Sequence, residues 1–133
     1  MEPLESLIKR SKKGVTRLTK NSIILKTIIA AIQEKKGENI VSLDLRKITE
    51  AVSDFFIVCE ASSQPHVRGI AENIEQRVKE NIGENVFHKE GFQNLNWVLL
   101  DYVNVVVHIM LPESRKFYAL EEMWNDAQSE EHE

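Results

Sequence analysis

The sequence predicts a single α/β domain in which a mixed β-sheet of about five strands is flanked by helices. Segments with apolar residues at helical spacing alternate along the chain with short segments rich in β-branched and aromatic residues. The 133 residues are enough for one domain with a substantial core, but not for two comfortable ones. The 42% of apolar and 29% of charged residues are typical of a globular chain, and a single cysteine excludes a disulfide framework.

The first half of the chain is expected to form a helix, two strands and a second helix. Residues 21–36 carry apolar side chains at the spacing of one helical face, namely Leu25, Ile28, Ile29 and Ile32. Residues 39–45 alternate between apolar and polar and indicate a half-buried strand, whereas residues 54–60 are apolar on both faces and indicate a central one. Ser62, Ser63 and Pro65 predict the start of the second helix, and Gly83 its end.

The second half is expected to add three strands and a last helix. Residues 85–90 predict a short strand, and residues 95–102 and 104–110 predict a hairpin. A helix is expected to begin near Pro112, with Phe117, Leu120 and Trp124 on one face. This order of elements predicts a sheet with helices on both faces. We therefore expect a basic, flexible arm (residues 1–20), one domain (residues 21–127) and an unpacked acidic tail (residues 128–133).

Charge is distributed unevenly along the chain. Residues 1–20 have a net charge of +4, whereas the remaining residues have a net charge of −8. This distribution argues against broad nucleic-acid binding by the body of the protein, because phosphate contacts require clustered bases. The arm alone is a candidate for RNA contact, through Lys9, Arg10, Lys12 and Lys13. The alternative is a solvated terminus without a partner.

The sequence contains no segment that predicts a membrane span or a secretory signal peptide. Its most apolar stretch, residues 97–111, is interrupted by Asp101, Asn104 and His108. We therefore expect a cytoplasmic protein.

The residues that would carry enzymatic chemistry are absent or isolated. Cys59 lies within an apolar strand segment with no adjacent cation, which indicates a core thiol. The four histidines show no metal-ligand spacing, and no glycine-rich phosphate loop is present. The sequence therefore predicts no catalytic residues, no metal and no cofactor.

One enzymatic alternative arises from the Ser62-Ser63 turn after a strand of a mixed sheet, an arrangement similar to that of nucleotidyltransferases. Those enzymes hold two magnesium ions on closely spaced strand carboxylates. Here Asp44 precedes Leu45-Arg46 and Asp54 precedes Phe55-Phe56, so the carboxylate pair is missing. A nucleotide-binding protein of this fold, or a generic adaptor, remains as an alternative.

The expected hairpin carries residues that suit a protein interface. Trp97 and Tyr102 combine an apolar body with a polar tip, as interface anchors often do. Trp97 and His108 are equally compatible with burial in the core. The residues themselves therefore indicate an α/β domain that binds another macromolecule.

Several segments, in order, resemble one protein family. They are Asp54-Phe-Phe-Ile-Val58, Ser63-Gln64 with Val67 and Ile70-Ala71, Glu90-Gly91, Trp97-Val-Leu-Leu-Asp-Tyr102, Val105-Val-Val-His108, and Phe117-Tyr118 with Leu120-Glu121 and Trp124. Together they resemble the ribosomal silencing factor family (RsfS, or Iojap-like) from about residue 23 to 127. The block from Trp97 to His108 is the most specific part, since its length, order and spacing all agree.

The resemblance implies a non-enzymatic protein with a nucleotidyltransferase-like sheet that lacks the catalytic carboxylate pair. It also implies binding to the large ribosomal subunit through ribosomal protein L-fourteen, which blocks the small subunit and represses translation under nutrient limitation. Carried over by position, the residues expected at or behind the contact are Asp54, Glu90, Trp97, Leu99, Asp101, Tyr102 and His108. The oligomeric state is left open between monomer and homodimer.

The sequence departs from the family pattern at two places. Val103 stands where many relatives have glycine after Asp-Tyr, and a β-branched residue disfavours a turn with positive φ. Pro65-His66 replaces polar residues at the start of the second helix, a change that a helix start tolerates.

Overall fold

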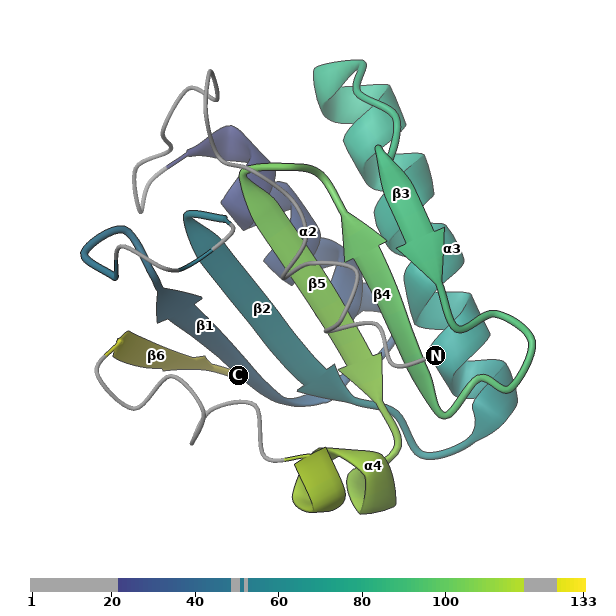
Figure 1. Ribbon diagram of the computed structural model, residues 1–133. Coiled ribbons are helices and arrows are strands. Elements are labelled where there is room, and N and C mark those ends of the chain that lie inside the picture. Colours follow the sequence, from purple (N-terminus) through teal and green to yellow (C-terminus); the bar gives the residue numbers. More distant parts are fainter. Residues whose placement is uncertain (1–21, 49–50, 52, 119–126) are drawn as a thin grey trace.

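A computed structural model describes residues 22–48, 51, 53–118 and 127–133. Within them a six-stranded sheet carries two long helices on one face, and a short helix lies at one end of the sheet (Figure 1). In chain order the elements are α2 (Ile23–Glu34), β1 (Glu38–Asp44), β2 (Phe55–Glu60), α3 (Gln64–Ile82), β3 (His88–Glu90), β4 (Trp97–Asp101), β5 (Val105–Met110), α4 (Pro112–Tyr118) and β6 (Gln128–His132).

The sheet is mixed, as the sequence predicts. Its strand order is β3-β4-β5-β2-β1-β6. The central strands β2 and β5 are parallel, with Phe55 opposite Val105 and Glu60 opposite Met110, and the other neighbouring pairs are antiparallel. Strands β4 and β5 form the expected hairpin, in which Trp97 lies opposite Met110.

The two long helices form where the apolar spacing and the end signals predict them. In α2 the side chains of Leu25, Ile28 and Ile32 are buried, and Ile29 packs partly against the same core. In α3 the Ser63 hydroxyl accepts a hydrogen bond from the backbone N–H of His66, which caps the helix start. Gly83 ends α3 with a φ of 79°, a left-handed conformation that glycine adopts without strain.

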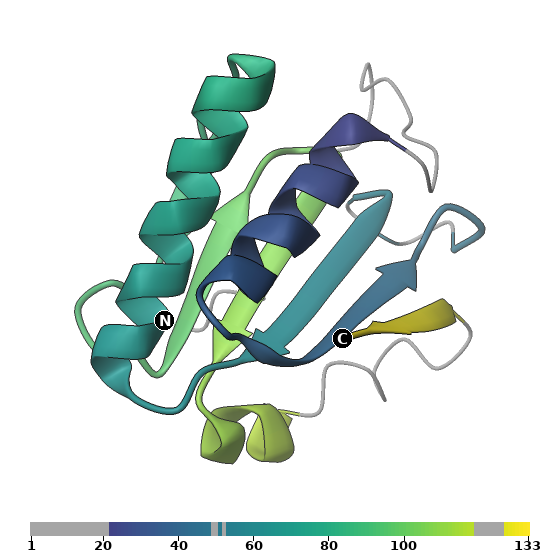
Figure 2. The ribbon, with the colours of Figure 1, turned by 180° about the vertical axis from the view of Figure 1, so that it is seen from behind.

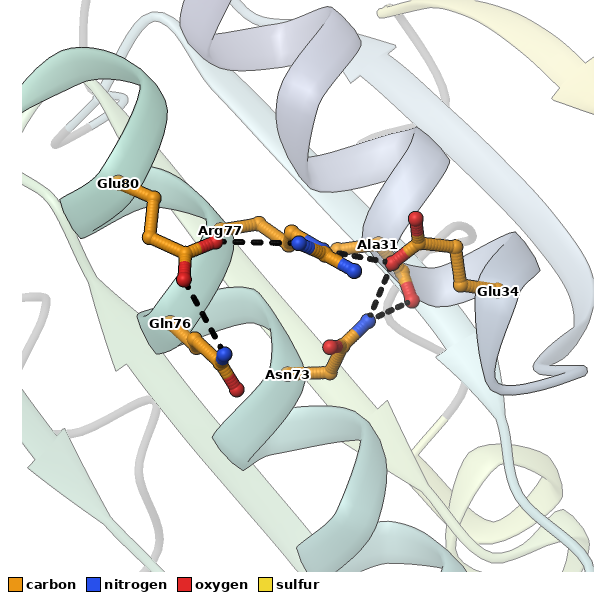
Figure 3. A network of polar contacts seen from close by, with 6 residues as sticks. All are labelled: Ala31, Glu34, Asn73, Gln76, Arg77 and Glu80. Atoms are coloured by element: carbon orange, nitrogen blue, oxygen red, sulfur yellow. Dashed lines mark hydrogen bonds and ion pairs between the residues drawn. The ribbon is translucent and has the colours of Figure 1, made fainter.

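A polar network joins α2 to α3 (Figure 3). The Asn73 side-chain amide donates to the carbonyl of Ala31 and to the Glu34 carboxylate, both at 2.9 Å. Arg77 also donates to Glu34, at 2.9 Å. These donors, first Asn73 and then Arg77, lower the pKa of the Glu34 carboxyl. The network fixes how the two helices lie beside each other across the sheet (Figure 2).

Each face of the sheet has its own buried apolar cluster. Phe55, Ile57 and Cys59 of β2 pack with α2 and α3 in the helix-side cluster. Phe56 and Val58 belong to a second cluster on the opposite face. The five residues Phe55–Cys59 are all buried, which confirms the central strand with two apolar faces.

The structure departs from the sequence prediction in three places. Residues 128–132, expected in an unpacked tail, form β6, which pairs antiparallel with β1 from Ile40 to Asp44 and adds a sixth strand. That part of the prediction is wrong, because backbone pairing with β1 does not require apolar side chains. Strand β3 is confined to three residues of the expected six. Both long helices lie on the same face, whereas helices on both faces were expected.

Two expectations lie outside the described residues. The basic arm (residues 1–20) is one, and Leu120 and Trp124 of the last helix are the other.

Candidate partner-binding site

Five of the seven predicted contact residues come together on the second face of the sheet, which α2 and α3 do not cover. Cross-strand pairing places Glu90 opposite Leu99 and Leu99 opposite His108, so the three form one row across β3, β4 and β5. Trp97 and Asp101 lie two residues to either side of Leu99 on β4 and therefore point to the same face. We call these five residues the second-face site.

A hydrogen bond between Trp97 and His108 organises the centre of the second-face site. The indole Nε1–H donates to His108 Nδ1 at 3.0 Å. The imidazole also packs against the Phe56 ring, with centroids 4.7 Å apart. Because Nδ1 accepts, the proton of the neutral ring lies on Nε2, an atom that is buried and has no hydrogen-bond partner among the described residues. Burial lowers the pKa of His108 to about 3 and keeps the ring neutral.

Most of the predicted residues are buried in the isolated chain. Trp97 is 6% exposed, Asp101 2%, and Leu99 and His108 not at all. Glu90 is the exception: its side chain is 13% exposed, and one carboxylate oxygen lies 2.7 Å from His88 Nε2. Trp97, Leu99, Asp101 and His108 therefore support the second face from below its surface, and Glu90 is the member whose side chain reaches that surface.

The turn between β4 and β5 depends on Asp101. The backbone N–H of Val103 donates to Asp101 Oδ1 at 2.7 Å, and Tyr102 N–H donates to the carbonyl of Val105 at 2.9 Å. Val103 has a φ of 76°, so this β-branched residue occupies the left-handed region. The sequence predicts that Val103 disfavours a turn with positive φ. The structure nevertheless forms this turn, and the backbone of Val103 is strained in it.

Asp54 connects this turn to the start of β2. Its backbone N–H and that of Phe55 both donate to the carbonyl of Asn104, at 2.9 and 3.1 Å. The carbonyl of Asp54 in turn accepts from the N–H of Leu45 at 2.8 Å. These backbone hydrogen bonds link the connections at this end of the sheet. Because Asp54 is only 2% exposed, its carboxylate does not lie at the surface.

Tyr102 lies apart from the second-face site. Its side chain is buried in the helix-side cluster, which places it on the opposite face of the sheet. Burial raises the pKa of its phenol, and the hydroxyl has no hydrogen-bond partner within the described part of the chain. Tyr102 therefore supports the packing of the hairpin under the helices.

Gly91 lets the chain approach β4 closely after β3. It has a φ of 93°, and a Cβ atom at this position would lie 2.0 Å from the carbonyl oxygen of Trp97. Glycine alone fits here. The Glu90-Gly91 pair noted in the sequence therefore has a structural role, since Gly91 sets the path of the chain beside Glu90 and Trp97.

Elsewhere the described residues offer no catalytic or metal centre. Cys59 is fully buried, and desolvation raises the pKa of its thiol to about 12. Asp44 is engaged by Arg46, whose guanidinium donates to both carboxylate oxygens. No group of three or more His, Cys, Asp or Glu side chains with a metal-binding arrangement occurs in residues 22–48, 51, 53–118 and 127–133. None of the helices in these ranges is long and apolar enough to cross a membrane.

Sequence reasoning missed part of the second face. Leu43, Phe56, Val58 and Met110 are buried in the same cluster as Trp97 and Leu99. Alternation along their strands separates these residues from their helix-side neighbours. The central strands β2 and β5 are apolar on both faces, however, so their sequence does not reveal which face carries the site. The candidate RNA contacts Lys9, Arg10, Lys12 and Lys13 lie outside the described residues.

Comparison with solved structures and curated proteins shows which class of protein this chain resembles. The fold is similar to a crystal structure of a protein from Chromobacterium violaceum, with a TM-score of 0.73 and 35% identity over 77% of this chain and 83% of that one. Among curated proteins, the ribosomal silencing factor RsfS of Bacillus subtilis (strain 168) is 40% identical over 104 residues, which are 78% of this chain and 86% of that protein. The chloroplastic protein Iojap of Zea mays is 34% identical over 104 residues, 76% of this chain and 43% of that protein.

The family follows from the sequence model described as "Ribosomal silencing factor during starvation", which matches residues 19–133. The chain belongs to the ribosomal silencing factor (RsfS) family. The matched region extends to the last residue and so includes β6, beyond the segment in which the resemblance was recognised from sequence.

Proposed function

We propose that this protein binds the large ribosomal subunit through ribosomal protein L-fourteen and prevents the small subunit from joining, which represses translation when nutrients are limiting. The observation that carries the proposal is the family match over residues 19–133. Such a blocker needs no chemistry. An interface of roughly 1,600 Å² suffices if it lies where the second subunit would collide.

The second-face site supports the proposal as the place of contact. The row Glu90, Leu99 and His108 crosses three neighbouring strands, and a hydrogen bond from Trp97 fixes its orientation. Leu99 and His108 are fully buried, so they support the surface around Glu90 from beneath, and a surface held rigidly in this way binds without a folding cost. Glu90 is the charged member whose side chain reaches the surface, where it is 13% exposed and contacts His88, so its change tests the contact most directly.

The direct test is co-sedimentation of the purified protein with separated ribosomal subunits, followed by a subunit-joining assay. We expect the protein to pellet with the large subunit only and to lower the yield of joined ribosomes as its concentration rises. Failure to pellet at near-physiological salt would contradict the proposal. Calorimetry with nucleoside triphosphates would then test the nucleotide-binding alternative.

Charge reversal at Glu90 maps the contact. Glu90→Lys is expected to weaken binding to the large subunit by about tenfold, because it places a charge of the wrong sign at the proposed surface. Glu75→Lys is the matched control, since Glu75 lies on α3, on the other face of the sheet, and its side chain is 25% exposed and paired with Lys89. Equal affinities of the two variants would move the contact away from the second-face site.

The basic arm is a second proposed contact, with ribosomal RNA. If Lys9, Arg10, Lys12 and Lys13 meet phosphates, deletion of residues 1–20 flattens the dependence of log affinity on log salt concentration by almost one unit for each lost contact. An unchanged slope would show that the arm does not contact RNA.

A further inference from the structure

We propose that a cavity between α2 and β6 binds a small organic cation, an ammonium or guanidinium group on a short apolar stem. The cavity has a volume of about 220 Å³, which corresponds to roughly seven water molecules. It lies on the helix side of the sheet, at the β1–β6 edge, and so does not overlap the second-face site. The proposal is independent of ribosome binding.

One wall of the cavity is apolar. Leu25 and Ile29 of α2 form it together with the ring of Phe55, which is 3% exposed overall. These side chains supply a surface against which a short hydrocarbon stem loses its contact with water.

The opposite wall is polar and acidic. Ser42 and Asp44 of β1 pair with Glu130 and Gln128 of β6, so that alternate side chains of the two strands face the cavity. Two carboxylates, Asp44 and Glu130, line the cavity together with His132, and Lys and Arg are not among the lining residues. Asp44 is paired with Arg46 from outside the lining, so Glu130 carries the remaining negative charge. This lining repels an anion and attracts a cation.

The chain already places one organic cation beside this wall. The Arg46 guanidinium donates to Asp44 at 2.7 and 2.9 Å, and its central carbon lies 5.2 Å from the centroid of the Phe55 ring. Phe55 and Asp44 thus accommodate a flat cation between a π face and a carboxylate. Arg46 occupies Asp44, so a ligand would use Glu130. The Glu130 side chain is 64% exposed, and its carboxylate lies 3.9 Å from Nδ1 of His132, so a ligand would bind beside this contact.

The polar wall is held in place before any ligand arrives. Ser42 Oγ and His132 Nε2 form a hydrogen bond of 2.9 Å across the β1–β6 pair. At the end of β6 the Gln33 amide of α2 donates to the carbonyl of Glu133. The two contacts fix β6 against β1 and α2, so the cavity needs little rearrangement to bind a ligand.

The test uses agmatine, which joins a guanidinium and an ammonium through a four-carbon stem. Agmatine is titrated into the ¹⁵N-labelled full chain at about 150 mM salt, where diffuse attraction is screened, and the backbone amides of β1 and β6 are followed by NMR. Valerate has a similar stem and the opposite charge, so it serves as the ligand control. Glu130→Gln is compared with Glu131→Gln, which removes the same charge one residue away, on the opposite face of β6.

We expect saturable shifts confined to the cavity, affinity at least about fivefold lower for Glu130→Gln, and affinity within about twofold of the original for Glu131→Gln. The absence of saturation, equal binding of valerate or equal losses in the two variants would overturn the proposal. A blocked Gly-Arg-Gly peptide separates the sources of the cation. Tighter binding of the peptide than of agmatine assigns the cavity to an arginine side chain of a protein, and the reverse assigns it to a free amine.

Discussion

Replacement of Val103 by glycine is expected to stabilise the protein. Val103 has a φ of 76°, where an L-residue pays about 1–2 kcal/mol and a β-branched residue lies toward the upper end. Glycine removes this strain but adds about 0.5–1 kcal/mol of chain entropy to the unfolded state. The expected net gain in the free energy of unfolding is about 0.5–1 kcal/mol, or roughly 2–4 °C in Tm. The turn itself stays in place, because Asp101 Oδ1 binds a backbone N–H that glycine retains.

Urea denaturation and calorimetry measure this gain directly. Val103→Ala is the matched control, since alanine loses the β-branch but keeps the Cβ atom that opposes a positive φ, and it should gain less than glycine. A glycine variant less stable than the original protein would refute the argument. It would show that packing of the half-buried Val103 side chain outweighs the backbone strain.

Three further predictions concern stability. His108 stays neutral in the fold down to pH about 3, whereas the unfolded chain takes up a proton below about pH 6.5. His108 should therefore cost about 1.4 kcal/mol of stability for each pH unit of acidification within that window. His108→Gln, which retains an acceptor for Trp97, should flatten the measured curve of stability against pH, and an equally steep curve would contradict the assignment. Asn73→Ala removes buried donor contacts between α2 and α3 and should cost about 1–2 kcal/mol in urea denaturation, and a loss near zero would argue that the network is not structural. Gly91→Ala should cost about 2 kcal/mol or more because its Cβ meets backbone, whereas Gly69→Ala, with open space around it in α3, should be neutral or stabilising, and thermal melts of the pair give the comparison.

Much of the fold could be predicted because local signals and tertiary packing agree. The Ser63 cap, the apolar face from Val67 to Val78 and the Gly83 stop all act within α3, and each is present as expected. Strand β6 could not be predicted in the same way. Its side chains are polar and largely exposed, and it exists because its backbone groups pair with those of β1, a long-range interaction without a pattern in the sequence.

Sequence could predict which candidate residues lie near one another, but not how far each is exposed. The motif from Trp97 to His108 identified residues that the sheet does bring together. Sequence could not separate Tyr102 from them, since the turn carries it to the helix side of the sheet. Nor could it show that Leu99 and His108 are fully buried, because burial depends on what packs above a strand and not on the strand itself.

Strand β6 also has a consequence for solubility. Without it, β1 would be the outermost strand on its side of the sheet, with unpaired N–H and C=O groups beside the apolar side chains of Ile40, Val41 and Leu43. An open edge of that kind recruits strands from other molecules. The chain covers it with a strand that carries Glu130 and Glu131, so the outermost edge becomes acidic and repels a second copy. The acidic strand β6 thus protects the sheet against edge-to-edge aggregation. A protein shortened before Gln128 should precipitate at concentrations at which the full chain stays in solution.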